Sequence, residues 1–198
     1  METLGLSSPV ERSENRLKTL FWPAVKSGTD VDYLGTQGYW VCTFVAVVSF
    51  VFSVRSPVLA TILLLFFYLG GVGVRERDVY AAAMVFAFYA VDTLVSTFFL
   101  FFSSPWGLIV VRFFITALLF ANIRATWIAS KWQVDSEQAA LPPRLSETFA
   151  DKLADQLPAK IWPKARIPYY IFGVLMLFIT TLGLAGMLGK FIVRALAR

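Results

Sequence analysis

Five long apolar runs, separated by short charged or proline-containing segments, dominate this chain. They extend over Tyr39–Val54, Val58–Val74, Val79–Phe102, Trp106–Ser130 and Ile167–Leu188. A hydrocarbon core of ~30 Å requires about 20 helical residues to cross it. The last three runs reach that length, and the first two fall slightly short but are flanked by arginines that can snorkel. The pattern predicts an all-α membrane protein, an antiparallel helical bundle of about five transmembrane helices with short interfacial amphipathic helices.

The apolar runs divide the chain into four parts. We expect a cytoplasmic N-terminus with an interfacial helix over 1–38, a four-span transmembrane bundle over 39–130, a cytoplasmic loop with an amphipathic helix over 131–166, and a fifth transmembrane helix with a basic tail over 167–198. Only a few residues separate successive runs within 39–130, so the first four spans should be consecutive antiparallel neighbours.

The amphipathic helix of the loop is indicated by its apolar spacing. The apolar residues recur every four positions, at Leu145, Phe149, Leu153 and Leu157. This narrow stripe suits a membrane surface or a partner helix. Pro158 should end the helix, because proline interrupts the backbone hydrogen bonds. Asp151 and Asp155 alternate with Lys152, and a solvated helix face is sufficient to explain them.

The distribution of lysine and arginine predicts the orientation in the membrane. With the N-terminus in the cytoplasm, 13 of these residues lie inside and 5 outside, as the positive-inside rule requires. The tail after Leu188 disagrees, because five spans place its basic residues outside. It either extends the last helix towards lipid phosphates or a partner, or follows a run that enters the membrane without crossing it.

Aromatic and basic residues mark the expected membrane boundaries. Three tryptophans adjoin the spans and are predicted to be interfacial anchors, namely Trp22, Trp106 and Trp162. Three arginines are expected to form an inner basic ring that binds lipid headgroups, namely Arg75, Arg77 and Arg124.

Asp92 and Arg112 are the charged residues within the spans that most invite a functional interpretation. Measured from the turn between the third and fourth spans, they lie at similar depth, so we expect an intramembrane ion pair. Tyr89, Ser96 and Thr116 should complete a polar face around them. The pair could simply fix helix register, or it could belong to a proton or ion relay.

Small residues indicate where helices approach closely. Two groups of glycines are expected to pack helices, namely Gly70, Gly71 and Gly73 in the second span and Gly183, Gly186 and Gly189 in the fifth. Packing within the bundle and contact with another chain are both open for the terminal helix.

The residue inventory restricts the chemistry. The chain has no histidine and one cysteine, so it lacks the usual metal and haem ligands and the usual general base at neutral pH. Cys42 lies in an apolar run and is expected to be a packed, inert thiol. We therefore predict no cofactor, no metal site and no catalytic residues. The net charge of +5 is concentrated at span ends and in one loop, a distribution that argues against nucleic-acid binding.

Three segments resemble uncharacterised small bacterial integral membrane proteins with about four spans: FWPAVKSGTDVDYLGTQGYW, FYLGGVGVRERDVYAAAM and FANIRATW. The resemblance covers residues 21–127 and implies no activity. The long loop and the last span are additional to that pattern and could serve attachment.

These features together favour a non-enzymatic accessory, scaffold or self-assembling subunit of the bacterial inner membrane, with its N-terminus in the cytoplasm. Its expected partners are membrane lipids and other membrane subunits or further copies of itself. The alternative is a small channel or transporter with a polar path around Asp92 and Arg112. A lipid-modifying enzyme using Arg75, Asp78 and Arg124 is a weaker third hypothesis, because a general base tuned to neutral pH is missing.

Overall fold

A computed structural model describes residue 25 and residues 28–100, 106–132 and 149–196. These residues form α2 (Gly28–Phe52), α3 (Pro57–Arg75), α4 (Val79–Leu100), α5 (Trp106–Trp132), the short α6 (Phe149–Asp151), a π-helical turn η1 (Lys152–Gln156) and α7 (Leu157–Leu196). The described part of the chain has five helices long and apolar enough to cross a membrane, in α2 to α5 and along η1 and α7. The protein is a bundle of these five helices, as the sequence predicts.

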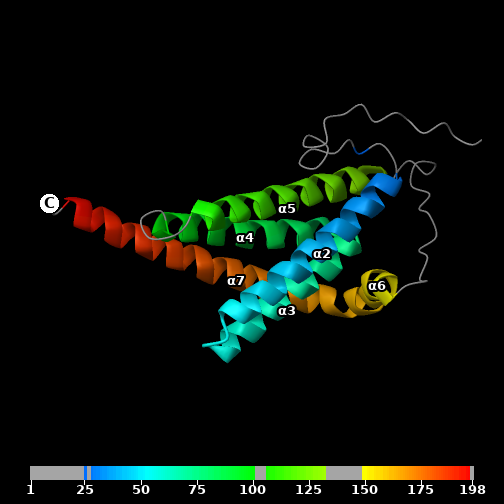
Figure 1. Cartoon of the computed structure of the whole chain (residues 1–198), viewed down its shortest axis with the longest axis horizontal. Helices are drawn as coiled ribbons and strands as arrows, with labels where there is room; N and C mark the ends of the chain where they lie inside the picture. Colours follow the sequence, from blue (N-terminus) through cyan, green and yellow to red (C-terminus); the bar gives the residue numbers. More distant parts are fainter. Residues whose placement is uncertain (1–24, 26–27, 101–105, 133–148, 197–198) are drawn as a thin grey trace, which may run out of the picture.

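The bundle has three limbs that meet at one end (Figure 1). The α2–α3 hairpin and the α4–α5 hairpin are two of the limbs, and α7 is the third. The limbs pack together around the end of α3 and the beginning of α4, which we call the Arg75 end. They then diverge, so that the α2–α3 turn lies well apart from the beginning of α5 and from the C-terminal part of α7.

Glycines allow the close packing at the Arg75 end. A Cβ atom on Gly71 would lie 2.8 Å from the Cβ of Cys42 on α2, and one on Gly73 would lie 2.5 Å from both the Ala81 Cβ and the Trp162 ring. Gly70 is similarly enclosed by Val85 and by Tyr169 of α7. The second half of α3 thereby contacts α2, α4 and α7 at once, because small residues let helix backbones approach closely.

Aromatic rings fill the layer next to these glycines. The Phe66 ring of α3 lies 4.8 Å from Phe88 of α4 and 5.6 Å from Tyr169 of α7, measured between ring centroids. Phe67 lies 6.1 Å from Tyr89 in an edge-to-face arrangement. Such pairs stabilise the packing beyond simple burial of apolar area. Cys42 is fully buried in the same core.

The helix that contains the first predicted span, α2, begins at Gly28 and not at Tyr39. Its first turns contain polar residues, so the apolar run in the sequence begins later than the helix does. Val31 and Leu34 are buried, the Asp32 side chain forms an ion pair with Arg75, and the Thr36 hydroxyl donates to the Asp32 carbonyl at 3.0 Å. Hydrogen bonding within the bundle therefore compensates for the polar composition.

The prediction that Pro158 ends a separate helix is wrong. Helical backbone continues from Phe149 through η1 into α7, and Pro163 and Pro168 also lie inside α7. Pro158 has no N–H to donate to the carbonyl of Ala154, four residues earlier. The Arg75 Nε donates to that carbonyl instead, at 3.1 Å. A residue from α3 thus supplies a donor to this carbonyl, which lies within the π-helical turn.

Candidate functional site

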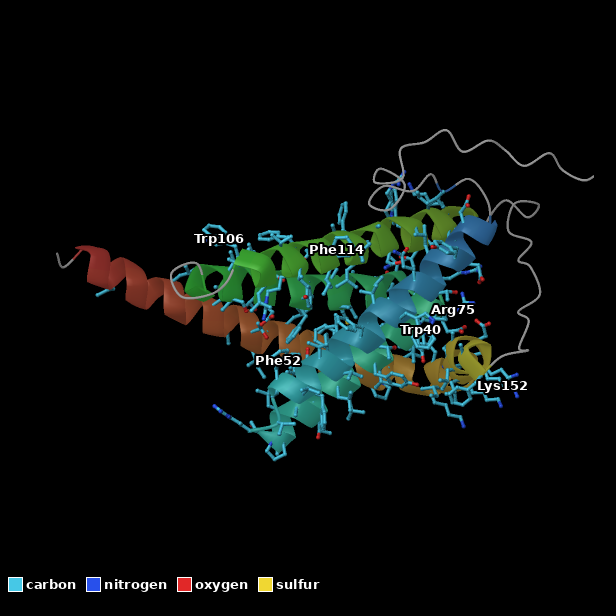
Figure 2. All side chains as sticks on the ribbon, in the orientation of Figure 1. Trp40, Phe52, Arg75, Trp106, Phe114 and Lys152 are labelled. Atoms are coloured by element: carbon cyan, nitrogen blue, oxygen red, sulfur yellow. The ribbon has the colours of Figure 1, made fainter. Side chains whose placement is uncertain are left out.

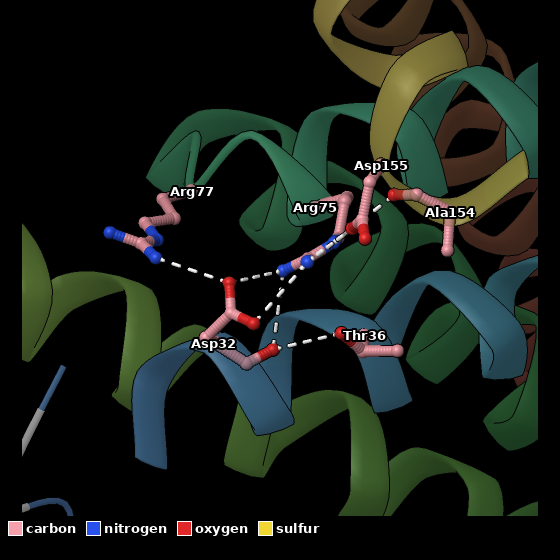
Figure 3. A network of polar contacts seen from close by, with 6 residues as sticks. All are labelled: Asp32, Thr36, Arg75, Arg77, Ala154 and Asp155. Carbon is pink, nitrogen blue, oxygen red and sulfur yellow. Dashed lines mark hydrogen bonds and ion pairs between the residues drawn. The ribbon is translucent and has the colours of Figure 1, made fainter. Parts of the chain in front are cut away.

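Arg75 is the centre of a polar network that joins three segments of the chain (Figure 3). Its guanidinium donates through Nη1 to Asp32 Oδ1 at 2.7 Å, and it donates to Asp155 Oδ1 through Nε at 3.0 Å and also through Nη2. Arg77 Nη2 lies 3.4 Å from Asp32 Oδ1. We call Asp32, Arg75, Arg77, Ala154 and Asp155 the Arg75 cluster. It ties α2, the end of α3 and η1 together.

The backbone at the end of α3 places these side chains. The Asp78 N–H donates to the Gly73 carbonyl at 2.9 Å, and the Arg77 N–H donates to the Val74 carbonyl at 3.0 Å. This is the Schellman pattern of helix termination, in which the residue at the Arg77 position adopts a left-handed conformation. Arg77 has a φ of 61°, an unfavourable value for a residue other than glycine. An arginine is held there despite that cost.

Asp78 connects α4 to α7. Its Oδ1 accepts the backbone N–H groups of Tyr80 at 3.0 Å and Ala81 at 3.2 Å, which is an N-cap of α4. Its Oδ2 accepts the Tyr170 hydroxyl and lies 3.0 Å from Arg166 Nε. The short turn between α3 and α4 therefore carries two separate attachments, through Arg75 to η1 and through Asp78 to α7.

Burial and pairing make the Arg75 cluster a structural joint. The Arg75 side chain is 2% exposed and faces two carboxylates, so its charge is balanced and its donors are used. Arg75 therefore has no exposed surface for a lipid headgroup, contrary to the expectation from the sequence. Arg77 and Arg124 lie at the same end of the bundle and are partly buried, and headgroup binding by these two stays a prediction.

The predicted tryptophan anchors have different environments. Trp162 is 6% exposed and packs on Gly73 and Tyr169, so it belongs to the core and is not an interfacial anchor. Trp106 is 65% exposed and projects outward at the beginning of α5, as Phe114 does farther along the same helix (Figure 2). Trp22 lies outside the described residues, as does the predicted N-terminal interfacial helix.

Asp92 and Arg112 meet between α4 and α5. The Arg112 Nη1 donates to Asp92 Oδ2 at 2.7 Å and to the Ser96 hydroxyl at 2.9 Å. The Thr116 hydroxyl donates to the Arg112 carbonyl at 2.8 Å and lies 3.4 Å from the Thr93 hydroxyl. We call Asp92, Ser96 and Arg112 the Asp92 site. The expected ion pair is present, and two of the three residues expected around it adjoin it.

The Asp92 site differs from the Arg75 cluster in exposure. The side chains of Arg112 and Asp92 are 31% and 48% exposed. Tyr89, the third residue expected in this polar face, is 8% exposed and packs against Phe67. The Asp92 site is consequently an ion pair on the surface of a membrane helix hairpin. Whether it forms part of a polar transport path is a prediction that this geometry does not test.

The two groups of glycines also differ. Gly70, Gly71 and Gly73 are enclosed by neighbouring helices, whereas no atom would lie within 4 Å of a Cβ on Gly183, Gly186 or Gly189 in the described part of the chain. The second group lies on the portion of α7 that has diverged from the other limbs. Within the described residues, Gly70, Gly71 and Gly73 of α3 thus pack against neighbouring helices, whereas Gly183, Gly186 and Gly189 in the last part of α7 do not.

The Arg75 cluster contains residues that reading the sequence did not select. Asp32 lies in a polar stretch before the first apolar run. The alternation of Asp155 with Lys152 predicts a solvated face, but the Asp155 side chain is only 13% exposed. Pro158 does indicate that this segment needs an additional donor, because proline leaves the Ala154 carbonyl without its usual backbone N–H. No spacing rule, however, connects Arg75 to residues about 80 positions away.

No family model, curated protein or solved structure matches this chain. The resemblance noted over residues 21–127 therefore stays a prediction. Within residues 28–100, 106–132 and 149–196, no group of three or more histidine, cysteine, aspartate or glutamate residues is arranged to hold a metal ion.

Proposed function

We propose that this protein is a non-enzymatic subunit of the bacterial inner membrane that assembles through α7 with further copies of itself or with other membrane proteins. In this proposal the Arg75 end faces the cytoplasm. The α2–α5 hairpins and the joint at the Arg75 end form a base, and α7 projects from it as the assembling helix.

The burial of α7 carries the proposal. Only 11% of the residues in its most apolar stretch are buried in the chain, against 33–44% in the other four spans. α7 has 40 residues, about 60 Å of helix or twice the hydrocarbon thickness. It extends beyond the hairpins in Figure 1. Its open part bears Gly183, Gly186 and Gly189, and small residues of this kind favour close contact between membrane helices.

The polar attachments support the same role. Asp155 pairs with Arg75, and Asp78 interacts with both Tyr170 and Arg166, all at the beginning of the last span. These contacts anchor one end of α7 to the bundle while its other half stays separate. A helix fixed at one end is suited to present its free half to a partner in a defined orientation.

The test is native mass spectrometry after mild extraction, with matched glycine variants. We expect the wild type to be an oligomer or to carry partner subunits, and Gly186→Leu to release the monomer without loss of folding. Gly107→Leu is the control, because a Cβ at Gly107 also meets nothing within 4 Å but lies on α5. A wild-type monomer without partners, or a Gly186→Leu variant that assembles like the control, would contradict the proposal.

A further inference from the structure

The Asp92 site has hydrogen-bonding capacity that the described residues do not use. A guanidinium has five N–H donors, and the contacts of Arg112 with Asp92 and Ser96 both use Nη1. The Nε and Nη2 of Arg112 and the Oδ1 of Asp92 have no partner among the described residues. Charged groups at membrane depth are costly unless they are paired or hydrogen-bonded. This site is therefore suited to take a polar ligand.

The direction in which the site opens follows from the register of α4. Asp92 lies four residues after Phe88 and three after Tyr89, so these residues share a helix face. Phe88 and Tyr89 are covered by Phe66 and Phe67 of α3. Away from the Arg75 end, the α2–α3 limb diverges from α4 and α5 (Figure 1). The Asp92 side chain, which follows this covered part of α4, is 48% exposed.

The depth of the site brings it within reach of lipid headgroups. Arg112 follows Trp106 by six residues, a rise of about 9 Å along α5. Trp106 is 65% exposed, and exposed tryptophans at the ends of membrane helices lie at headgroup level. Arginine side chains can extend several ångströms towards the interface. Leu108, one turn from Arg112 in that direction, is 50% exposed and offers an apolar contact.

The charges of the site select the kind of headgroup. A cation and an anion lie side by side, 2.7 Å apart, so a purely anionic headgroup is attracted by Arg112 but repelled by Asp92. A headgroup with a phosphate and a primary ammonium complements both charges. The phosphate oxygens accept N–H groups from Arg112, and the ammonium donates to Asp92. A quaternary choline headgroup lacks that N–H donor.

We propose that the Asp92 site binds the headgroup of a zwitterionic phospholipid with a primary ammonium, that is, a phosphatidylethanolamine. The phosphate lies on Arg112 and the ammonium on Asp92, in the region where the two hairpins diverge. This binding concerns the open face of the α4–α5 hairpin, and it is independent of the assembly proposed for α7.

Native mass spectrometry of the full chain with defined lipids tests this assignment. The protein is presented with equal amounts of phosphatidylethanolamine, phosphatidylcholine and phosphatidylglycerol with matched acyl chains. We expect the ethanolamine lipid to be retained at least about fivefold over phosphatidylcholine, as one additional hydrogen bond of about 1 kcal/mol requires. We also expect it to be retained above phosphatidylglycerol, whose hydroxyls can donate to Asp92 but whose headgroup has no positive charge to attract that carboxylate. Equal retention of the three lipids, or a preference for phosphatidylglycerol, would overturn the proposal.

Variants identify the site. The double variant Asp92→Asn/Arg112→Gln should lose the preference, and Arg55→Gln should keep it, because Arg55 lies in the exposed α2–α3 turn, outside the site. Retention of the preference by the double variant would reject the assignment. The assignment would also be rejected if the wild type formed dimers without bound lipid and the double variant did not, because a second copy of the chain would then occupy the site. The comparison of headgroups on the wild type stands even if a variant does not fold.

Discussion

At the scale of single residues, Arg75 is the position whose loss should be most damaging. Arg75→Gln removes the cation between Asp32 and Asp155 and also removes the donor to the Ala154 carbonyl. Asp155, which is 13% exposed, then loses its cation, whereas Asp32 keeps Arg77 at 3.4 Å. We therefore expect a loss of about 3 kcal/mol, the lower end of the cost of breaking a buried ion pair. Unfolding in mixed detergent micelles measures the effect. The control Arg55→Gln, at an exposed turn, should change the free energy of unfolding by about 0.5 kcal/mol or less. Equal losses for the two variants would show that the Arg75 cluster does not hold the segments together.

Asp92 and Arg112 allow a residue-scale test of coupling. In a double-mutant cycle of Asp92→Asn and Arg112→Gln, we expect a non-additive energy of about 1 kcal/mol, within the range found for residues in direct contact. The contact of 2.7 Å supports a coupling, while the partial exposure of both side chains keeps it below that of a buried pair. Strictly additive stability losses, measured by the same unfolding assay, would show that the pair does not exist in the membrane protein.

At the scale of elements, the left-handed residue at the end of α3 predicts that a glycine variant is more stable than an alanine variant. Both Arg77→Ala and Arg77→Gly remove the contact with Asp32, but only glycine adopts a φ of 61° without a steric cost. Arg77→Gly should therefore be more stable than Arg77→Ala by about 1 kcal/mol. The order is opposite to that expected inside a helix. Thermal unfolding in detergent compares the two, and a more stable alanine variant would argue against the left-handed turn.

The glycines of two helices provide a second element-scale test. A methyl group at Gly73 would overlap Ala81 and the Trp162 ring, whereas one at Gly183 meets nothing within 4 Å. Gly73→Ala should destabilise the bundle by about 1–3 kcal/mol, as overpacking does in tight cores, and Gly183→Ala should leave the stability of the isolated chain unchanged. The same unfolding assay applies. Equal effects of the two substitutions would mean that α7 packs on the bundle along its whole length.

For the whole molecule, apolar runs predicted the helical bundle because burial in hydrocarbon leaves a strong compositional signal. Depth counting along the chain also predicted that Asp92 and Arg112 would meet. The Arg75 cluster was missed because ion pairs between distant segments leave no periodic pattern. The continuity of α7 through Pro158 could not be predicted either, since the compensating donor comes from α3. Sequence patterns thus predicted the features that burial in the membrane determines. They did not predict the features that depend on tertiary contacts, such as the donor from α3 that allows a helix to continue through a proline.

The placement of the charged joint in the cytoplasm is the last prediction, and it concerns the molecule as a whole. If the Arg75 end faces the cytoplasm, as proposed, five crossings would place the α2–α3 turn and the end of α7 on the outer side, and the end of α5 on the inner side. Cys42 is fully buried, so introduced cysteines can be labelled with little background. A membrane-impermeant maleimide should modify Ser56→Cys and Val193→Cys in intact cells, and Ser130→Cys only after permeabilisation, because the positive-inside rule places the basic end in the cytoplasm. The two serine sites are matched in chemistry and exposure, which makes each the control for the other. Labelling of Ser130→Cys in intact cells would show that the orientation is the opposite one. Protection of Val193→Cys in intact cells would mean that α7 does not cross the membrane.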